Sequence, residues 1–224
     1  MPTTMEPKSK SPASPATAAP AQARERRAPS QRQLLIGGGA LIVIALAAWM
    51  WFTSGKRKEE FAGRALLQAR SAAEQGNLPV AATEFQKVID TYRGTAAAQE
   101  AVIGLNQVRM INGQSDLAAV SLREFLAGNP EPRFAAPAHG MLAASLENAG
   151  RPADAASSYE RASEVATVEY LKAEYLVDAG RAHLAAGKRA EAEAAYRAVL
   201  TRHPQSASVT EARVRLAELT GGKI

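Results

Sequence analysis

The side chains best suited to acid–base or metal chemistry are three histidines, His139, His183 and His203, in a chain of 224 residues that has no cysteine. A histidine can move a proton near neutral pH or bind a metal ion, but either task needs a partner group at a suitable spacing. No second histidine stands at ligand spacing, and Asp178, five residues before His183, does not share its helix face. We therefore interpret the three histidines as surface or packing residues, and we predict no metal site.

Motifs for phosphate binding or nucleophilic catalysis are also missing from the sequence. It contains no G-x-x-x-x-G-K-[ST] loop, no G-x-S-x-G turn and no H-E-x-x-H pair. The glycines at 37–39 fall inside an apolar run, where they cannot cradle a phosphate. Serine and threonine are frequent, but no base is placed to activate one. The sequence therefore predicts a protein that is not an enzyme and uses no cofactor.

The net charge of +5 is concentrated at the start of the chain. Residues 1–33 carry six Lys/Arg and two Asp/Glu, whereas residues 34–224 carry 21 and 20. A nucleic-acid-binding domain should carry its cations on a folded surface, so this distribution argues against nucleic acid as a partner. Residues 1–33 are also rich in Pro, Ala, Ser and Thr without apolar periodicity, a composition that predicts a disordered tail.

An uninterrupted apolar run at residues 34–52 predicts one transmembrane helix. With one flanking residue included, we place this helix at residues 34–53. Its 19 residues carry no charged or strongly polar side chain, and as a helix they would span about 28 Å, close to the hydrocarbon thickness of a bilayer. A cleaved signal peptide or a buried helix fits less well, because the run and the preceding tail are long and no A-x-A-like site follows. Within about 20 residues of the run, four basic residues precede it and five follow it, so the positive-inside rule does not choose an orientation.

A period of 37 residues organises the rest of the chain and predicts an α-solenoid. Glycines mark the period at Gly76, Gly113, Gly150 and Gly187. Five residues after each glycine stands an alanine, at positions 81, 118, 155 and 192, and nine after it stands a bulky residue, Phe85, Leu122, Tyr159 or Tyr196. Twelve after come Val88, Phe125, Ala162 and Val199, and prolines follow in the second and fourth repeats at Pro130 and Pro204.

Each offset has a physical reason. A glycine closes a helix because the left-handed backbone costs it nothing. The next helix can then start with Asn77 or Ser115 as N-cap, or with Pro79 or Pro152 in its first turn. Offsets 5, 9 and 12 share one helix face, which we expect to be buried. The small alanine allows close helix approach, the bulky residue fills the gap to the neighbouring pair, and the proline ends the helix.

The first helix of each repeat is also apolar-periodic, and the whole pattern predicts an all-α protein. We expect these positions to face the core: Ala65, Leu66, Ala69 and Ala72; Ile103, Leu105, Val108 and Ile111; Leu142, Ala143, Leu146 and Ala149; Leu176, Ala179, Leu184 and Ala185. The repeat domain is predicted at residues 57–222, with helix pairs at about 59–94, 95–131, 132–167 and 168–204 and a capping helix at 206–219. Short turns are expected at 93–95 and 128–133.

These residues resemble the tetratricopeptide repeat family. The pattern G-N-L-x-x-A-x-x-x-F-x-x-V-I at Gly76–Ile89 is similar to the second-helix signature of that family, as is G-K-R-A-E-A-E-A-A-Y-R-A-V-L-T-R-H-P at Gly187–Pro204. Gly180 matches the small residue of the first helix. The period of 37 resembles the variant seen in bacterial envelope proteins. The resemblance implies a scaffold that binds proteins or peptides.

A tail, one anchor and then such repeats also resembles the YfgM-like family of ancillary subunits of the SecYEG translocon. That resemblance implies a bacterial inner-membrane protein with a cytoplasmic N-terminus, periplasmic repeats, and Sec components, periplasmic chaperones or exported chains as partners. An alternative class is an envelope organiser of the cell-division-coordinator or outer-membrane-assembly type. A third is a repeat domain that regulates a neighbouring enzyme. The oligomeric state stays open.

First helices line the concave face of such solenoids, so their inward, non-core positions are the candidate peptide-binding surface. By register these positions are Leu66, Arg70, Ile103, Gln107, Met110, Ala144, Glu147, Val177, Arg181 and Leu184. Apolar residues mixed with a few charges suit an extended or helical peptide. A purely structural concave face is the competing interpretation. The Lys/Asn arrangement that clamps peptide carboxyl termini in some members of the family is missing here.

Overall fold

The computed structural model describes the backbone of residues 31–222 and the side chains of Ile44, Trp49 and residues 55–222. All regular secondary structure in this part of the chain is α-helical, as predicted. The helices are α1 (Gln31–Glu74), α2 (Leu78–Thr91), α3 (Ala96–Ile111), α4 (Ser115–Ala127), α5 (Pro132–Asn148), α6 (Pro152–Val165), α7 (Glu169–Ala185), α8 (Arg189–Arg202) and α9 (Ser208–Thr220).

The chain divides into two compact units, Met1–Trp49 and Met50–Ile224, and α1 continues from the first into the second. The predicted tail at residues 1–33 lies outside the described residues, except that Gln31 already begins α1. Residues 34–52, the predicted membrane span, have helical backbone as part of α1. Most of their side chains lie outside the described residues. In the part of the chain that the structure describes, none of the helices combines the length and the apolar character that a bilayer span requires.

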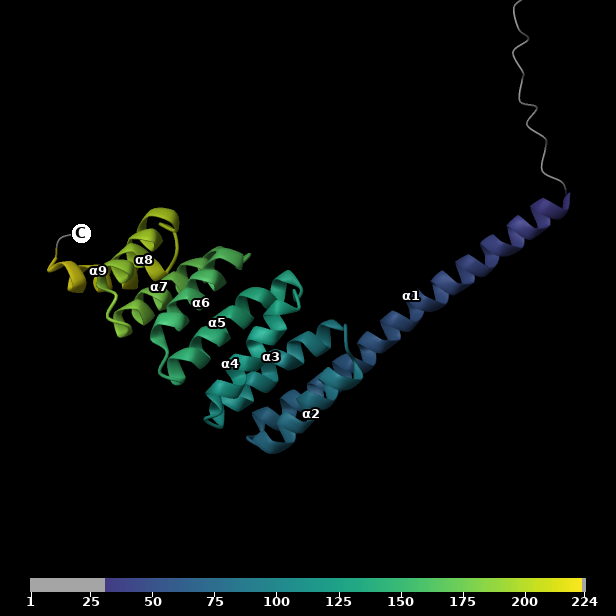
Figure 1. The fold of residues 1–224 in the computed structure, drawn as a ribbon, viewed down its shortest axis with the longest axis horizontal. Coiled ribbons are helices and arrows are strands. Elements are labelled where there is room, and N and C mark those ends of the chain that lie inside the picture. The colour runs from purple at the N-terminus through teal and green to yellow at the C-terminus, as the bar shows by residue number, and fades with distance from the viewer. Residues whose placement is uncertain (1–30, 223–224) are drawn as a thin grey trace, which may run out of the picture. The chain divides into compact units, whose positions relative to one another are not determined.

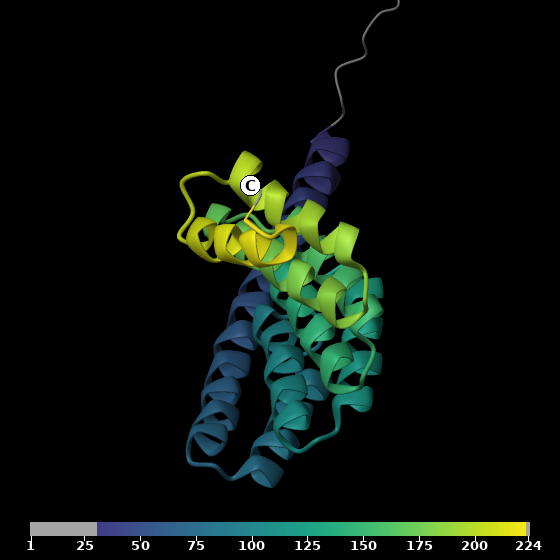
Figure 2. The same cartoon turned by 90° about the vertical axis from the view of Figure 1, so that its left-hand side faces the viewer.

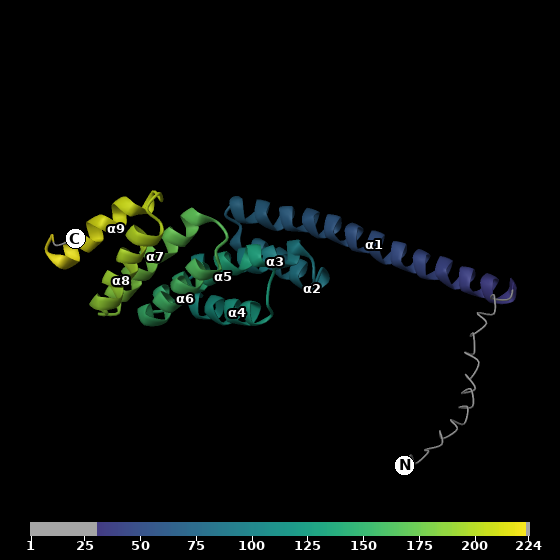
Figure 3. The ribbon, with the colours of Figure 1, turned by 90° about the horizontal axis from the view of Figure 1, so that it is seen from above.

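In the second unit, each helix packs against the next one in sequence from α2 to α9 (Figure 1). First helices also contact across repeats, α3 with α5 and α7 with α9. The view along the stack shows these elements layered one behind another (Figure 2). Seen from above, α4, α6 and α8 lie along one side of the array, and α1 and α9 lie toward the other (Figure 3). The arrangement is a two-layered helical solenoid, which separates a face of first helices from a face of second helices.

The turns between paired helices have the predicted geometry. The backbone φ angles of Gly76, Gly113, Gly150 and Gly187 are 75°, 73°, 72° and 74°, all in the left-handed region. At the first of these turns the Asn77 side chain accepts a hydrogen bond from the Val80 amide, which confirms it as an N-cap. Because a side chain at a positive φ is strained, the periodic glycines are explained by the backbone of the turn alone.

The four periodic alanines confirm the predicted close helix contact, since Ala81, Ala118, Ala155 and Ala192 are all 0% exposed. The bulky residues four positions later are buried as well, namely Phe85, Leu122, Tyr159 and Tyr196. Three of the four residues at the next offset, Val88, Ala162 and Val199, are also buried.

Some predicted positions differ from the structure. Ser115 is not an N-cap but the first residue of α4, because the chain closes tightly and the Gln114 amide donates to the Arg109 carbonyl. Phe125 is only partly buried. Ile111 is 63% exposed and Ala185 is exposed, since both stand in the last turn of a first helix, where the partner helix no longer covers them. The cap helix α9 begins at Ser208 rather than at residue 206.

The first helix of the array, α1, exposes polar side chains on the side where a preceding repeat would stack. In α3, the positions that pack against the preceding helix pair are Ala101, Leu105 and Val108, all buried in a cluster with α2 residues. The positions 37 residues earlier in α1 are Arg64, Gln68 and Ser71, all exposed. Because a further repeat stacked here would have to bury these polar groups, α1 serves as the N-terminal edge of the solenoid.

Candidate functional site

The first candidate site is a groove of about 510 Å³ on the face of first helices, between α1 and α3. It contains three of the ten predicted contact residues, Arg70, Ile103 and Gln107. The sequence analysis missed other lining residues, which are Ala73, Glu74, Leu78, Phe85, Glu100, Gly104, Val108 and Ile111. Gly104 matters most among them, because a Cβ there would lie 2.6 Å from the Phe85 ring. A side chain at position 104 would therefore displace the Phe85 ring from the floor of the groove.

The electrostatics of this groove are dominated by an ion pair at its rim. The Arg70 guanidinium pairs with the Glu100 carboxylate, and both side chains are more than a third exposed. An exposed pair of this kind contributes little to stability, so a ligand can replace either partner at low cost. Beyond the pair, the exposed Gln107 amide and the half-buried Ile103 offer one polar and one apolar contact.

A second group of predicted residues meets farther along the same face. Arg181 on α7 donates to Glu147 on α5 over 3.1 Å and to Asp178 over 3.0 Å. The Tyr159 hydroxyl on α6 donates to the other oxygen of Glu147 over 2.8 Å. The sequence analysis missed Tyr159 and Asp178, although the hydroxyl could have been expected because a buried tyrosine needs a partner.

The pKa values in this network follow from its burial and its hydrogen bonds. Burial raises the pKa of the Tyr159 phenol, and the Glu147 carboxylate that accepts a hydrogen bond from its hydroxyl raises it further. For Arg181, burial lowers the pKa, but the hydrogen bond to Asp178 and the negative charge of Glu147 outweigh it, so the net pKa is raised. The tyrosine is therefore neutral and the arginine charged across the physiological range, which makes the network a fixed support between α5, α6 and α7.

The remaining predicted contact residues are covered to different extents. Leu66 and Val177 are 5% and 6% exposed and belong to the hydrophobic core, so they cannot touch a ligand on the folded surface. Ile103 stands at the same repeat position but is half-buried in the groove, so the stacking of neighbouring helices, and not the repeat position alone, decides which of these side chains is covered. Met110, Ala144 and Leu184 are half-buried. Of the ten residues, Arg70, Ile103 and Gln107 lie together in the α1–α3 groove.

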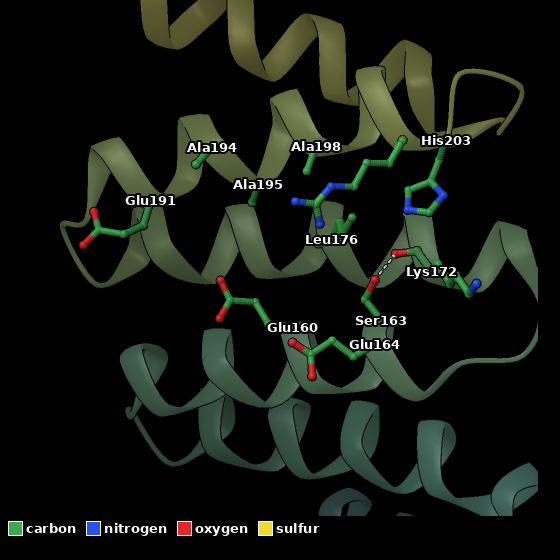
Figure 4. Close-up of a pocket in the computed structure, with 11 residues that line it drawn as sticks. Glu160, Ser163, Glu164, Lys172, Leu176, Glu191, Ala194, Ala195, Ala198 and His203 are labelled. Atoms are coloured by element: carbon green, nitrogen blue, oxygen red, sulfur yellow. Dashed lines mark hydrogen bonds between the residues drawn. The ribbon is translucent and has the colours of Figure 1, made fainter. Parts of the chain in front are cut away.

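A further groove of about 520 Å³ opens between the second helices α6 and α8, with α7 at its base (Figure 4). Its α6 side carries Glu160, Ser163 and Glu164, and its α8 side carries small residues at 194, 195 and 198. The Ser163 hydroxyl donates to the Lys172 carbonyl over 2.9 Å, which joins α6 to α7. The groove is thus lined mainly by charged and small side chains, with Leu176 of α7 as the large apolar residue at its base.

Histidines border this groove. His203 on its rim lies 2.5 Å from the Glu169 carboxylate, and this hydrogen bond is the main cause that lowers the pKa of Glu169. His183 is buried, and its Nε2 lies 2.9 Å from Glu160. Both imidazoles therefore tie neighbouring helices together, which agrees with their interpretation as packing residues. In the part of the chain that the structure describes, no three His, Asp or Glu side chains gather as metal ligands would.

Comparison with known proteins agrees with this architecture. The family model described as a tetratricopeptide repeat-like domain matches residues 31–221. A crystal structure of MamA protein superposes with a TM-score of 0.57 at 19% identity, covering 73% of this chain and 83% of that one. Another crystal structure of MamA gives a TM-score of 0.55 at 19% identity, with 69% and 84% covered. No curated protein matches the chain.

At 19% identity the likeness to MamA shows a shared fold. The family match covers most of the chain, including every helix of the solenoid. The left-handed glycines, the buried alanines and the stacked helix pairs are the features that such a repeat requires. The chain belongs to the tetratricopeptide repeat-like domain family.

Proposed function

We propose that this protein is a membrane-anchored scaffold, not an enzyme, and that it binds a segment of another protein in the groove between α1 and α3. The repeat-like fold supports protein binding in general. The observation that carries the specific proposal is Ile111, which lines this groove and is 63% exposed. The same repeat position is Glu74, Asn148 and Ala185 in the other repeats. The half-buried Leu78 and Ile103 line the same groove, so Ile111 is part of an apolar surface of several side chains rather than a single scattered one, which is typical of a contact site.

The chemistry of the groove defines the kind of segment that it fits. Ile111 and Leu78 provide an apolar surface for one side chain of the ligand, and Gln107 can hydrogen-bond to its backbone. The Arg70–Glu100 pair can open to engage a charged side chain of either sign. An extended or helical segment with alternating apolar and polar residues matches this pattern.

A photo-crosslinking residue in place of Gln107, in the full chain in its native membrane, tests the proposal. We expect it to capture one or a few specific partners, with the yield reduced several-fold by Ile111→Asn. Because Ile111 is exposed, this substitution should leave the thermal midpoint nearly unchanged. Val214→Asn is the matched control, since Val214 is 51% exposed on α9 and lies outside the groove. A yield unchanged by Ile111→Asn would reject the groove as the binding surface.

The proposal that the chain is anchored in the membrane rests on the apolar residues 34–52. Deletion of these residues should release the protein from membranes during alkaline extraction, whereas the intact chain should stay with them. A reporter fused after Ile224 tests the orientation that the YfgM-like resemblance implies, with the repeats in the periplasm of a bacterial inner membrane. Activity of a reporter that works only in the cytoplasm would reverse that orientation.

Within this scaffold role, we favour an ancillary adaptor of the Sec translocon or of periplasmic chaperones, on the resemblance of the tail, anchor and repeats to the YfgM-like family. The alternative is an envelope organiser of the cell-division-coordinator or outer-membrane-assembly type. The two differ in what the residue at position 107 should capture. Sec components or exported chains support the adaptor, while peptidoglycan or outer-membrane machinery supports the organiser.

A further inference from the structure

The face of second helices carries two grooves at equivalent repeat positions. Their lining residues are 74 positions, or two repeats, apart in the sequence. One is the α6–α8 groove of Figure 4, and the other lies between α2 and α4, over α3, with a volume of about 440 Å³. Equivalent lining residues are Gln86 and Glu160, Ile89 and Ser163, Val102 and Leu176, Leu117 and Glu191, Val120 and Ala194, Ser121 and Ala195, and Glu124 and Ala198. The same backbone position therefore carries different chemistry in the two halves.

The α2–α4 groove is the apolar one. Leu117 and Val120 on its α4 rim are 57% and 52% exposed, whereas the equivalent residues in the other groove are Glu191 and Ala194. Phe125 at the end of the groove is only partly buried. Neither Leu117 nor Val120 is needed to hold the array together, so an apolar surface is exposed without a structural reason.

The α2–α4 groove also contains a positively charged side chain, Arg109, that has no carboxylate partner among the described residues. His183, at the position equivalent to Arg109, lies 2.9 Å from Glu160. In the α2–α4 groove the residue equivalent to Glu160 is Gln86, and the half-buried Arg109 bonds only to the neutral Asn106 amide oxygen over 3.0 Å. Among the described residues Arg109 has no ion pair. A half-buried guanidinium is best satisfied by an anionic partner.

A carboxylate that could pair with Arg109 is present on α4, but it lies toward the end of that helix that is far from Arg109. The Asn106 amide donates to the Ser121 hydroxyl and fixes the register of α3 on α4, and the Gln114 amide at the start of α4 donates to the Arg109 carbonyl. Arg109 therefore lies beside the first turns of α4. Glu124, which lines the groove, is seven residues beyond Leu117, or about 10 Å along the helix. Within the described chain Glu124 forms no ion pair.

We propose that the occupant of this groove is the α4 helix of a second copy of the chain, packed antiparallel about a two-fold axis near Val120. Leu117, Val120, Ser121 and Glu124 share one face of α4, because they are spaced by three and four residues. Antiparallel pairing about this axis places Glu124 of each copy beside Leu117 and Arg109 of the other. The apolar side chains then meet at the centre, and two reciprocal Arg109–Glu124 pairs form at the ends.

The contact is self-complementary, as a two-fold interface must be. The carboxylate also approaches the N-terminus of the opposing helix, where the backbone dipole favours negative charge. One helix per copy buries less than the roughly 800 Å² per partner of a standard interface, so the dimer is weak and reversible. This assembly does not depend on the α1–α3 groove, and its test is independent of that function.

The first experiment uses the absence of cysteine in the natural chain. Val120→Cys in the full chain in its native membrane should form a disulfide-linked dimer on mild oxidation, because the two copies of residue 120 meet close to the axis. Ala194→Cys is the matched control, exposed at the equivalent position of the α6–α8 groove, and should stay monomeric. Equal crosslinking of both variants, or crosslinking of Val120→Cys only to a different protein, would overturn the proposal.

The second experiment tests the charge pairs in the Val120→Cys background. Arg109→Glu or Glu124→Arg alone should reduce the disulfide-linked dimer at least about five-fold, because each places like charges opposite each other. The double variant Arg109→Glu/Glu124→Arg should restore the yield to within about two-fold, since the pairs re-form with reversed sign. Circular dichroism melting confirms that all variants are folded. Yields unaffected by the single reversals, or a folded double variant without recovery, would reject the antiparallel pairing.

Discussion

Repeats 2 and 4 have the same backbone plan but fill their interiors in opposite ways. In repeat 4, Gly180 on α7 faces Tyr196 on α8, and a Cβ at Gly180 would lie 2.6 Å from the tyrosine ring. In repeat 2 the equivalent residues are Asn106 and Leu122, a larger side chain on the first helix and a smaller one on the second. The side chains of Asn106, Leu122 and Tyr196 are all buried, each with 0% exposure.

The difference shows that the repeat conserves volume between paired helices rather than residue type. A large side chain on the second helix requires a small residue on the first, because the interior is close-packed. The polar groups at these positions also differ between the two repeats. The Asn106 amide bonds to the Val102 carbonyl and the Ser121 hydroxyl, whereas the buried Tyr196 hydroxyl has no hydrogen-bond partner in the described structure. Substitutions at these positions therefore test whether side-chain volume sets the spacing of the paired helices.

Tyr196→Ala should have the largest effect. Tyr196 is 0% exposed and is among the largest fully buried side chains. Its removal beside Gly180 leaves a cavity that no neighbouring side chain on α7 can fill, so we expect a loss of about 3–5 kcal/mol in the free energy of unfolding. Urea denaturation followed by circular dichroism measures it. A loss below about 1 kcal/mol would mean that the two helices collapse together and that their spacing is not set by this ring.

Gly180→Ala should cost about 1–3 kcal/mol, because the added methyl group overlaps the Tyr196 ring, although alanine favours the helix itself by about 1 kcal/mol. In a Tyr196→Leu background the same substitution should become neutral or stabilising. The control is Gly63→Ala in α1, where a Cβ meets nothing within 4 Å and only the gain in helix propensity applies. A double-mutant cycle without coupling between positions 180 and 196 would contradict volume compensation.

Two tyrosines at the same repeat position should respond oppositely to loss of the hydroxyl. Tyr159→Phe removes the hydrogen bond to Glu147 and should cost about 1 kcal/mol. Tyr196→Phe removes a buried hydroxyl that has no hydrogen-bond partner in the described structure and should be neutral or stabilising by up to about 1 kcal/mol. Thermal or urea unfolding of the two variants side by side measures the contrast. Equal destabilisation would mean that Tyr196 has a partner, such as a buried water.

The smallest effect is expected at His139, where Val102 and Leu176 occupy the equivalent positions of repeats 2 and 4. Burial lowers the pKa of His139, and the charge of Arg161 lowers it further, against an opposing effect of Glu164. The folded state therefore binds fewer protons than the unfolded one, so stability is complete above the unfolded pKa of about 6.5 and declines as the pH falls through it.

His139→Leu should reduce this decline. The measurement is the difference in urea midpoint between pH 7.5 and pH 5.5, taken for the natural chain and for the variant. His183 and His203 are unchanged in both proteins, so their contributions cancel in the comparison. An identical pH dependence would show that His139 does not lose protons on folding.

Much of the fold could be predicted because the strongest signals are local. A glycine at a helix end and an alanine in a helix contact are each required by the backbone at that point, so Gly113 and Ala118 were placed correctly from spacing alone. The candidate site was harder. Gln107 was placed in a groove correctly, but Val177 was not. Val177 has the repeat position of Ile103, which lines the groove, yet it is buried in a cluster with Ala212 and Leu216 of α9, a contact that the spacing does not specify.

The spacing of residues along the chain was enough to predict the helical class, the 37-residue repeat and the turn at each periodic glycine, because these depend on contacts between residues near in sequence. It was not enough to predict which surface positions meet. In the structure, Ile111 is exposed in a groove, and Arg109 lines a groove with Gln86 at the position where the other half of the array has Glu160. Those facts depend on the stacking of helices from different repeats, which the local pattern does not specify.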